Sequence, residues 1–325
     1  MKLSHIFFAI VLIAFAAMSA AFAQVDEAQL LFTLNTTEPV SQIIWNDTGD
    51  VVTLVSKDRI DHVYVDDPAR TDTDNLASKT WNVTTVSETG LVAALSPDWN
   101  TIYLYDPSGS KELKSIDPGF PMLSVSVSKD GSMVLADSAD QIRTVIFDVE
   151  DGSIMHDLSG FETAAPVYDS RLSPDRKNVL WHARGTFALQ RIEDGSFGKT
   201  ISLWDFAASS ALSPDSRILA VGIINNDYEN GAVIFFDAWN GNELGRTILG
   251  KTAPHDLSFN EDGTILWAAD YNTAYRIDTE NCEVKAEIAA ADPENESDRI
   301  SRISSSPDGA SAAVLKNNGE LLIVN

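Results

Sequence analysis

One short turn, Ser-Pro-Asp-Gly in its clearest form, recurs seven times along the chain, each time after an apolar, strand-like stretch. The seven turns end at Gly49, Trp99, Gly131, Arg176, Ser216, Gly263 and Gly309. The intervals between these ends are 50, 32, 45, 40, 47 and 46 residues. The mean, about 43 residues, is the period of a β-propeller blade. The repeat therefore predicts an all-β fold, a single ring of seven blades, with six or eight blades as alternatives.

The third repeat shows how one blade is built. Residues 123–127 alternate apolar and polar side chains, a turn reverses the chain, and apolar runs near 133–136, 145–147 and 154–158 supply three further strands. Four short antiparallel strands cannot bury both faces of their own sheet, so neighbouring blades must stack and the ring must close. We therefore expect four antiparallel strands in each blade.

The two ends of the chain suggest how the ring closes. The seventh repeat ends after three strands, at residues 321–324, whereas an apolar stretch at residues 30–34 precedes the first repeat. We expect this N-terminal stretch to pair with the last blade as its outermost strand. It would cover an edge that otherwise promotes aggregation.

Residues 1–23 lie outside the repeat and resemble a signal peptide. Lys2 precedes an apolar run that ends in Ala-Phe-Ala at residues 21–23, a small-x-small pattern that signal peptidases cut. The run is short for a bilayer span, and a retained N-terminal anchor is the alternative. The expected mature protein is a propeller of residues 24–325, a secreted monomer that is extracellular or periplasmic and does not insert into membranes.

Acidic side chains dominate the composition. The chain has 48 Asp and Glu against 23 Lys and Arg, a net charge of −25. Such a surface repels phosphate backbones and anionic membranes, so no nucleic-acid partner is expected. A basic protein partner fits this charge better, although acidity also serves solubility alone.

Particular residues link the repeats to a known family. The strand end Phe147-Asp148 and the following turn are similar to a WD repeat, with Phe-Asp for Trp-Asp, and Tyr271-Asn272-Thr273 is similar to a YVTN repeat. The mature chain thus resembles the WD-repeat and YVTN-type β-propellers over its whole length. The Gly-His pair of well-formed WD repeats is absent. The resemblance implies a rigid scaffold for interactions.

Two repeats are irregular. The second is short by about a strand's length, which predicts a three-stranded or distorted blade. The acidic stretch 66–75 is expected to form a protruding loop, and residues 291–298 form a second polar insertion before the last blade. Long loops on a rigid scaffold often bind partners, and as often they only decorate the surface.

The sequence contains little catalytic chemistry. It has no Gly-x-Ser-x-Gly elbow, no His-Glu-x-x-His and no phosphate-binding Gly-rich loop. The lone Cys282 excludes an intramolecular disulfide. Residues 72–75 faintly resemble a calcium loop but lack its glycine and distal glutamate. We therefore expect no enzyme and no cofactor, with Ca²⁺ as the remaining metal candidate.

Repeat geometry yields one candidate site. Counting seven and five residues back from each turn end selects one face of the innermost strands, which should line the central channel. The selected residues are Gln42, Ile44, Val92, Ala94, Ser124, Ser126, Asp169, Arg171, Ser209, Ala211, Asp256, Ser258, Arg302 and Ser304. Within this set Asp169, Arg171, Asp256 and Arg302, with the adjacent His255, form the candidate ligand or partner site at the channel mouth. Alternatively, the two arginines and two aspartates pair with each other.

The most consistent interpretation is a noncatalytic propeller that acts as a protein–protein interaction scaffold. The alternative is a propeller enzyme, or a binder of small ligands or metals of the lactonase type, that uses the central channel. Among the seven tryptophans, several fall in strand positions, where core packing is expected, whereas Trp99 and Trp239 lie in or beside turns and are expected to be exposed.

Overall fold

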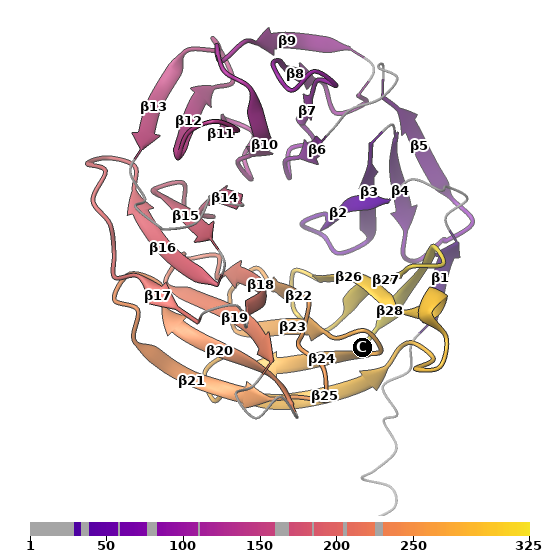
Figure 1. Cartoon of the computed structure of the whole chain (residues 1–325). Helices are drawn as coiled ribbons and strands as arrows, with labels where there is room; N and C mark the ends of the chain where they lie inside the picture. The colour runs from indigo at the N-terminus through magenta and orange to yellow at the C-terminus, as the bar shows by residue number, and fades with distance from the viewer. Residues whose placement is uncertain are drawn as a thin grey trace, which may run out of the picture.

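Seven four-stranded antiparallel sheets stand around a central channel in the computed structural model. It describes residues 29–33, 39–57, 59–76, 83–109, 111–159, 169–183, 185–203, 207–224 and 230–325. Figure 1 looks along the channel, with the first strand of each blade nearest the centre. The seven blades and the four strands in each confirm the predicted fold class. The expected signal peptide lies outside the described residues.

In the first six blades the four strands follow one another in sequence from the channel outward. Blade 1 contains β2 (Val40–Trp45), β3 (Val51–Ser56), β4 (Arg59–Tyr64) and β5 (Thr71–Asn75). Blade 2 contains β6 (Val83–Val86), β7 (Val92–Leu95), β8 (Ile102–Tyr105) and β9 (Glu112–Ile116). Blade 3 contains β10 (Met122–Val127), β11 (Met133–Ser138), β12 (Arg143–Asp148) and β13 (Ile154–Ser159).

The next three blades follow the same order. Blade 4 contains β14 (Asp169–Leu172), β15 (Asn178–Ala183), β16 (Thr186–Arg191) and the two-residue β17 (Ile201–Ser202). Blade 5 contains β18 (Ala207–Leu212), β19 (Ile218–Ile224), β20 (Gly231–Asp237) and β21 (Glu243–Ile248). Blade 6 contains β22 (Asp256–Phe259), β23 (Ile265–Ala269), β24 (Thr273–Asp278) and β25 (Glu283–Ala289).

Blade 7 joins the two ends of the chain. Its first three strands are β26 (Ile300–Ser305), β27 (Ala312–Lys316) and β28 (Glu320–Val324), and its outermost strand is β1 (Gln29–Thr33). β1 pairs antiparallel with β28, with Gln29 opposite Ile323 and Thr33 opposite Glu320. The predicted closure of the ring by the N-terminal strand is confirmed.

The turn after each innermost strand explains the repeated sequence signature. The first turn residue is a serine or asparagine, and its side chain accepts a hydrogen bond of 2.9 to 3.0 Å from a backbone N–H at the start of the next strand or one residue before it. The fourth residue has a φ between 60° and 85°, a left-handed conformation that favours glycine. Blades 4 and 5 depart from this preference, because Arg176 and Ser216 occupy the fourth position with a φ of 60°.

The second blade corrects the sequence prediction. It has four strands rather than three, and its inner turn is 87–90 rather than the turn ending at Trp99. The latter turn connects β7 to β8, yet its internal hydrogen bonds and its φ of 63° at Trp99 match those of the inner turns. When the turn end is moved to Gly90, the first two intervals become 41 and 41 residues, so the repeat is more regular than expected.

The acidic stretch 66–75 is also corrected. Its second half is not a protruding loop but β5, the outermost strand of blade 1. The hydroxyl of Thr73 in this strand donates to Asp61 Oδ1 of β4 at 2.7 Å. An outermost strand has one edge and much of its surface in solvent, so it needs few apolar side chains. The polarity of the sequence therefore concealed the strand.

The second polar insertion, 291–298, keeps an irregular course and ends in a 3₁₀ turn, η2 (Glu296–Asp298). Asp298 accepts a hydrogen bond of 3.0 Å from the ammonium group of Lys316. Lys316 is buried and also contacts Glu320 at 3.1 Å. The insertion is therefore fastened to blade 7.

Apolar side chains fill the layers between neighbouring blades. Trp181 of β15 and Trp267 of β23 are fully buried, and Trp45 is 8% exposed, so these three tryptophans in strands pack in the core. Trp181 packs against Leu135 of blade 3. Because each layer belongs to two blades, the core is a ring of interfaces rather than one central cluster.

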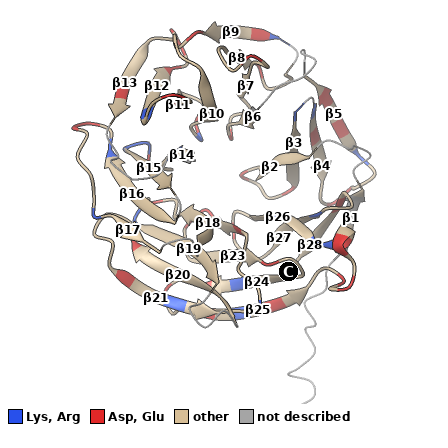
Figure 2. Cartoon of the chain, in the orientation of Figure 1, with Lys and Arg blue, Asp and Glu red and all other residues tan. Residues whose placement is uncertain are grey.

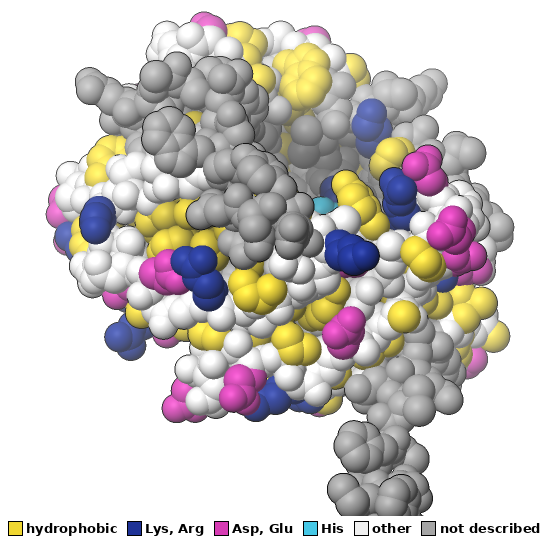
Figure 3. All heavy atoms as spheres, turned by 60° about the horizontal axis from the view of Figure 1, so that its bottom comes forward, with side chains coloured by type: hydrophobic (Ala, Val, Ile, Leu, Met, Phe, Trp, Pro, Cys, Tyr) yellow, Lys and Arg dark blue, Asp and Glu magenta, His cyan; other side chains and the backbone are white. Residues whose placement is uncertain are grey.

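Charged side chains are spread around the ring. Figure 2 shows Asp and Glu on the loops and on outer strands such as β5, β13 and β25. On the face in Figure 3, acidic, basic and apolar side chains are interspersed, and no single sign forms a continuous patch among the coloured atoms. The described part of the chain has no helix long and apolar enough to cross a bilayer.

Candidate functional site

The central channel contains two connected hollows. The hollow at the start of the innermost strands has a volume of about 640 Å³, and the one toward their turns has a volume of about 460 Å³. Both are bordered by Gln42, Lys129, Arg171 and Ser258. We call the first hollow the channel mouth.

Four of the five predicted site residues border the channel mouth. Arg171 comes from β14, His255 and Asp256 from the start of β22, and Arg302 from β26. Asp169 begins β14, and its side chain lies outside the described residues. The repeat geometry therefore brings these residues to one cavity, as the count from the turn ends predicts.

Most other members of the counted set border the channel, but Ser124 does not, because its hydroxyl donates to Asp137, and the two residues from blade 2 do not either. Gln42, Ser126, Ser209, Ser258 and Ser304 border the channel mouth, and Ile44 and Ala211 border the second hollow. Val92 and Ala94 do not, because they belong to β7 and are fully buried. Their place on the innermost strand is taken by Thr85 of β6, which borders the channel mouth. The error follows from the misassigned turn of blade 2.

Asp256 connects blade 6 to blade 7. Its Oδ2 accepts a hydrogen bond from the backbone N–H of Ile303 at 2.8 Å, and its Oδ1 accepts one from the N–H of Leu257 at 3.2 Å. Burial raises the pKa of Asp256, and the N–H of Ile303 and the charge of Arg302 oppose that rise. The carboxyl group therefore has a structural role at the blade junction.

His255 stacks on the ring of Tyr271, with 5.0 Å between ring centroids and 20° between planes. Both of its ring nitrogens are buried, and neither makes a hydrogen bond of normal geometry to the described residues, although the Ile300 backbone is close enough to raise the pKa of the ring. Burial lowers the pKa of His255, and the positive charge of Arg302 lowers it further. The imidazole is therefore held in its neutral form, with one N–H donor and one acceptor.

Arg302 is exposed toward the cavity. Its Nη1 donates to the backbone carbonyl of Ser301 at 3.0 Å. Among the described residues it forms no ion pair with a carboxylate, and Asp256 in particular is not bonded to it. The alternative in which the channel-mouth arginines and aspartates only neutralise each other therefore does not describe Arg302 and Asp256.

Among the described residues of the channel mouth, no nucleophile, base and orienting group are arranged together. In the described residues, no hydroxyl or carboxylate is hydrogen-bonded to His255, so no oriented nucleophile–base pair is present there. Within the same part of the chain, no three His, Cys, Asp or Glu side chains gather as a metal site. What the mouth offers is hydrogen-bond donors and positive charge.

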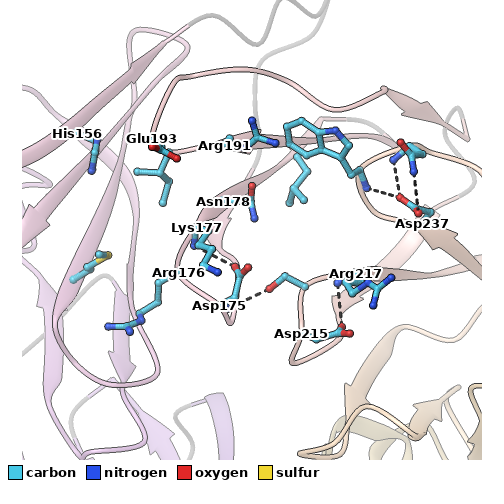
Figure 4. A pocket seen from close by; sticks show the side chains of 16 residues that line it. His156, Asp175, Arg176, Lys177, Asn178, Arg191, Glu193, Asp215, Arg217 and Asp237 are labelled. Carbon is cyan, nitrogen blue, oxygen red and sulfur yellow. Dashed lines mark hydrogen bonds between the residues drawn. The ribbon is translucent and has the colours of Figure 1, made fainter.

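A second pocket, which the sequence analysis missed, opens among blades 3, 4 and 5 beside the inner turns. Its volume is about 640 Å³. Its polar and charged lining includes His156, Asp175, Arg176, Lys177, Asn178, Arg191, Glu193, Asp215, Arg217 and Asp237. Figure 4 shows these side chains surrounding one hollow from separate segments of the chain. We call it the turn-face pocket.

The carboxylates of the turn-face pocket are occupied by their own turns. Asp175 accepts hydrogen bonds from Ser173 and from the N–H of Lys177, and Asp215 is bound in the same way. The N–H groups of Asn240 and Trp239 hold the pKa of Asp237 below its usual range. The hydrogen bonds of these three carboxylates therefore stabilise their own turns.

The basic and aromatic side chains of the pocket are more available. The guanidinium of Arg191 lies over the ring of Trp239, 4.6 Å from its centroid, a favourable cation–π contact. Arg191 also pairs with Asp194 at 3.2 Å on the surface. Trp239 is half-buried rather than fully exposed, whereas Trp99 is 39% exposed, as predicted.

One sequence signal could have located this pocket. Arg176 and Ser216 stand where five of the seven inner turns have glycine, and both border the turn-face pocket. The Arg191–Trp239 contact joins two blades and has no local signature. A comparison of the chain with protein-family models and with curated proteins finds no match.

Proposed function

We propose that the protein is exported and acts as a noncatalytic β-propeller that binds a protein partner at the turn-face pocket. The signal-like segment at residues 1–23 supports export. The fold supports a binding role, because a closed ring of blades presents rigid turns on one face. The composition of the pocket indicates where on that face the partner binds.

Backbone strain at the pocket is the main observation that supports this proposal. Arg176 and Ser216 hold a φ of 60° at positions where glycine removes the strain, and each such residue costs roughly 1 kcal/mol. Of the four described non-glycine residues with a positive φ, these two border the turn-face pocket, and Trp99 and Cys282 do not. Strain of this kind concentrates at binding sites, where the side chain is needed more than the relaxed backbone.

The pocket also has the chemistry of an interface centre. Tryptophan and arginine carry much of the binding energy in protein–protein interfaces, especially in partly enclosed pockets. Trp239 and Arg191 are already stacked, so little side-chain entropy remains to be lost on binding. The surrounding acidity, at a net charge of −25, favours a partner with a basic surface around the docking point.

Affinity capture tests the proposal. The tagged chain 24–325 is incubated with envelope and secreted fractions of its native host at two salt concentrations, and a recovered protein is then purified and titrated against the wild type. We expect one partner in near-equal amount, bound more weakly at high salt. Trp239→Ala combined with Arg191→Ala should weaken the purified pair at least about tenfold.

Two controls keep the test specific. Trp99→Ala removes an exposed tryptophan from another turn and should leave the affinity unchanged. Arg176→Gly relaxes the strained turn but also removes the exposed ion pair with Asp130, so it should change the melting temperature little while it weakens binding. Recovery of no partner, or equal binding by all variants, would reject the turn-face pocket as the docking site.

A further inference from the structure

Buried polar atoms without partners are concentrated at the channel mouth. In the described chain, five buried side-chain atoms lack a hydrogen-bond partner, and three of them, Nδ1 and Nε2 of His255 and Oγ of Ser126, belong to this cavity. Leaving such a group unsatisfied costs about 1–3 kcal/mol. Native structures retain few of them, and each one calls for an explanation such as a bound molecule.

The available groups are chiefly donors. The neutral imidazole of His255 offers one N–H, the hydroxyl of Ser126 offers one O–H, and the guanidinium of Arg302 keeps most of its N–H groups unused by protein. Arg302 lowers the pKa of His255, which shows that the two side chains are electrostatically coupled. A molecule that satisfies them must present acceptor oxygens and negative charge.

The carboxyl group of Asp256 does not compete for this role. Its Oδ2 is bound to the N–H of Ile303 in the next blade. Its pKa is raised by burial, so the protein already disfavours negative charge on it. Arg302 is exposed, and within the described ranges its side chain bonds only to the carbonyl of Ser301, so it can turn toward an incoming anion without breaking an ion pair to those residues.

We propose that the channel mouth binds a small oxyanion, a carboxylate or a phosphate, between Arg302 and His255. The remainder of the ligand extends across the channel toward Ser126. Figure 1 shows β10, which carries Ser126, across the ring from β22, beside His255. The hollow of about 640 Å³ between them has room for a metabolite-sized molecule.

Binding should be coupled to protonation of His255. The charged groups around this ring are Arg302 and Asp256 toward the cavity, Asp270 at the start of the next turn, and Arg299 on the ring of Tyr271. An oxyanion beside the imidazole adds negative charge to that of Asp270 and opposes the effect of Arg302. It would therefore favour the imidazolium and strengthen its own hydrogen bond.

The experiment is an NMR titration of the histidine rings in the chain 24–325, with inorganic phosphate in one arm and acetate in the other. We expect saturable shifts of the His255 resonances in at least one arm, and a higher pKa of His255 when the anion is bound. Arg302→Gln should weaken that anion at least about tenfold, the loss expected for one charge-assisted hydrogen bond. Ser126→Ala should weaken a longer dicarboxylate more than acetate.

Arg246→Gln is the matched control, because it removes an exposed arginine that pairs with Glu243 on the outer strand β21. It should leave the titration unchanged. A response to phosphate only, or to acetate only, identifies the oxyanion. No saturable shift up to about 50 mM of either anion, a concentration that would reveal even millimolar binding, overturns the proposal. Equal weakening by Arg302→Gln and Arg246→Gln would also overturn it.

Discussion

Two junctions between neighbouring blades each contain an aspartate, buried at one and half-buried at the other, and they use it differently. At the junction of blades 3 and 4, Asp137 accepts hydrogen bonds from the hydroxyls of Ser124 and Thr144 and from both the N–H and the hydroxyl of Ser170. At the junction of blades 6 and 7, Asp256 accepts only backbone N–H groups. The adjacent His255 is left with unpaired ring nitrogens.

The hydrogen bonds at the two junctions indicate a structural role for the first and leave room for ligand binding at the second. A buried polar network that is fully satisfied stabilises and specifies one arrangement of the blades. One that is partly satisfied costs stability unless something else completes it. Burial raises the pKa of both Asp137 and Asp256, so burial alone does not distinguish the two. What distinguishes them is the number and kind of hydrogen bonds around each.

Opening the ring should have the largest effect and should harm the two junctions unequally. Deleting residues 24–33 removes β1 and exposes the edge of β28 in blade 7, which adjoins the second junction. We expect a loss of several kcal/mol, from the paired backbone groups of β1, together with aggregation. Hydrogen exchange should accelerate more at the N–H of Ile303 than at that of Ser170.

Equal acceleration at both N–H groups would show that the ring opens as one cooperative unit. The two junctions would then not be separable in stability. A deletion of residues 24–28, which leaves β1 in place, is the control for a change at the N-terminus.

Removing each carboxyl group in turn should show which junction contributes more to the free energy of unfolding. Asp137→Ala leaves three hydroxyls and one N–H without their acceptor, so we expect a loss of about 3 kcal/mol in the free energy of unfolding. Asp256→Ala releases two backbone N–H groups, one of them adjacent in sequence, and should cost about 1 kcal/mol. Urea denaturation of both variants measures the difference. A larger loss for Asp256→Ala would reverse the assignment of roles.

The second junction should also respond to acid. The pKa of His255 is lowered by burial and by Arg302, so the unfolded chain takes up its proton at a higher pH than the folded chain. The stability that neutral His255 contributes is therefore present above about pH 6.5, the ordinary value for histidine. It is lost as the pH falls through the lower pKa of the folded state.

A His255→Asn variant checks this sign. The difference in unfolding free energy between wild type and variant should decline as the pH is lowered from 7 to 5. His156→Asn, on the outer strand β13, is the control and should show a smaller dependence. A difference that stays constant with pH for His255→Asn would contradict the burial of a neutral imidazole.

The sequence predicted those parts of the fold that have a local pattern. The turn signature predicted the blades and their number, and the leftover strand at the N-terminus predicted the closure. The same locality caused the error in blade 2, because the turn ending at Trp99 has the hydrogen bonds and left-handed φ of an inner turn. Only its spacing reveals that it connects β7 to β8. β5 was missed because a strand at the rim can be polar.

In the candidate sites, too, residues with a local sequence pattern were predicted and contacts without one were missed. Arg171, Asp256 and Arg302 were assigned to one cavity, because a fixed count from each turn end selects equivalent positions in a repeat. The turn-face pocket was missed because it combines side chains from three blades, and the Arg191–Trp239 contact depends on how blades 4 and 5 pack. Repeat geometry predicts positions within a blade, whereas contacts between unlike blades require the structure.

The smallest expected change in unfolding free energy comes from comparing two serines on the same strand. Ser124 and Ser126 lie two residues apart on β10, and the hydroxyl of Ser124 donates to Asp137 Oδ2 at 2.6 Å. Ser124→Ala should cost about 1–2 kcal/mol, because it removes a hydrogen bond to a buried carboxyl group. Ser126→Ala removes a buried hydroxyl that has no partner, so it should change stability by less than about 0.5 kcal/mol or slightly stabilise the fold.

Urea denaturation of the two variants measures both losses in unfolding free energy. Equal losses would mean that the hydroxyl of Ser126 is satisfied within the protein. A near-zero loss for Ser126→Ala, combined with weaker binding of a dicarboxylate, would assign that serine to a ligand rather than to the fold.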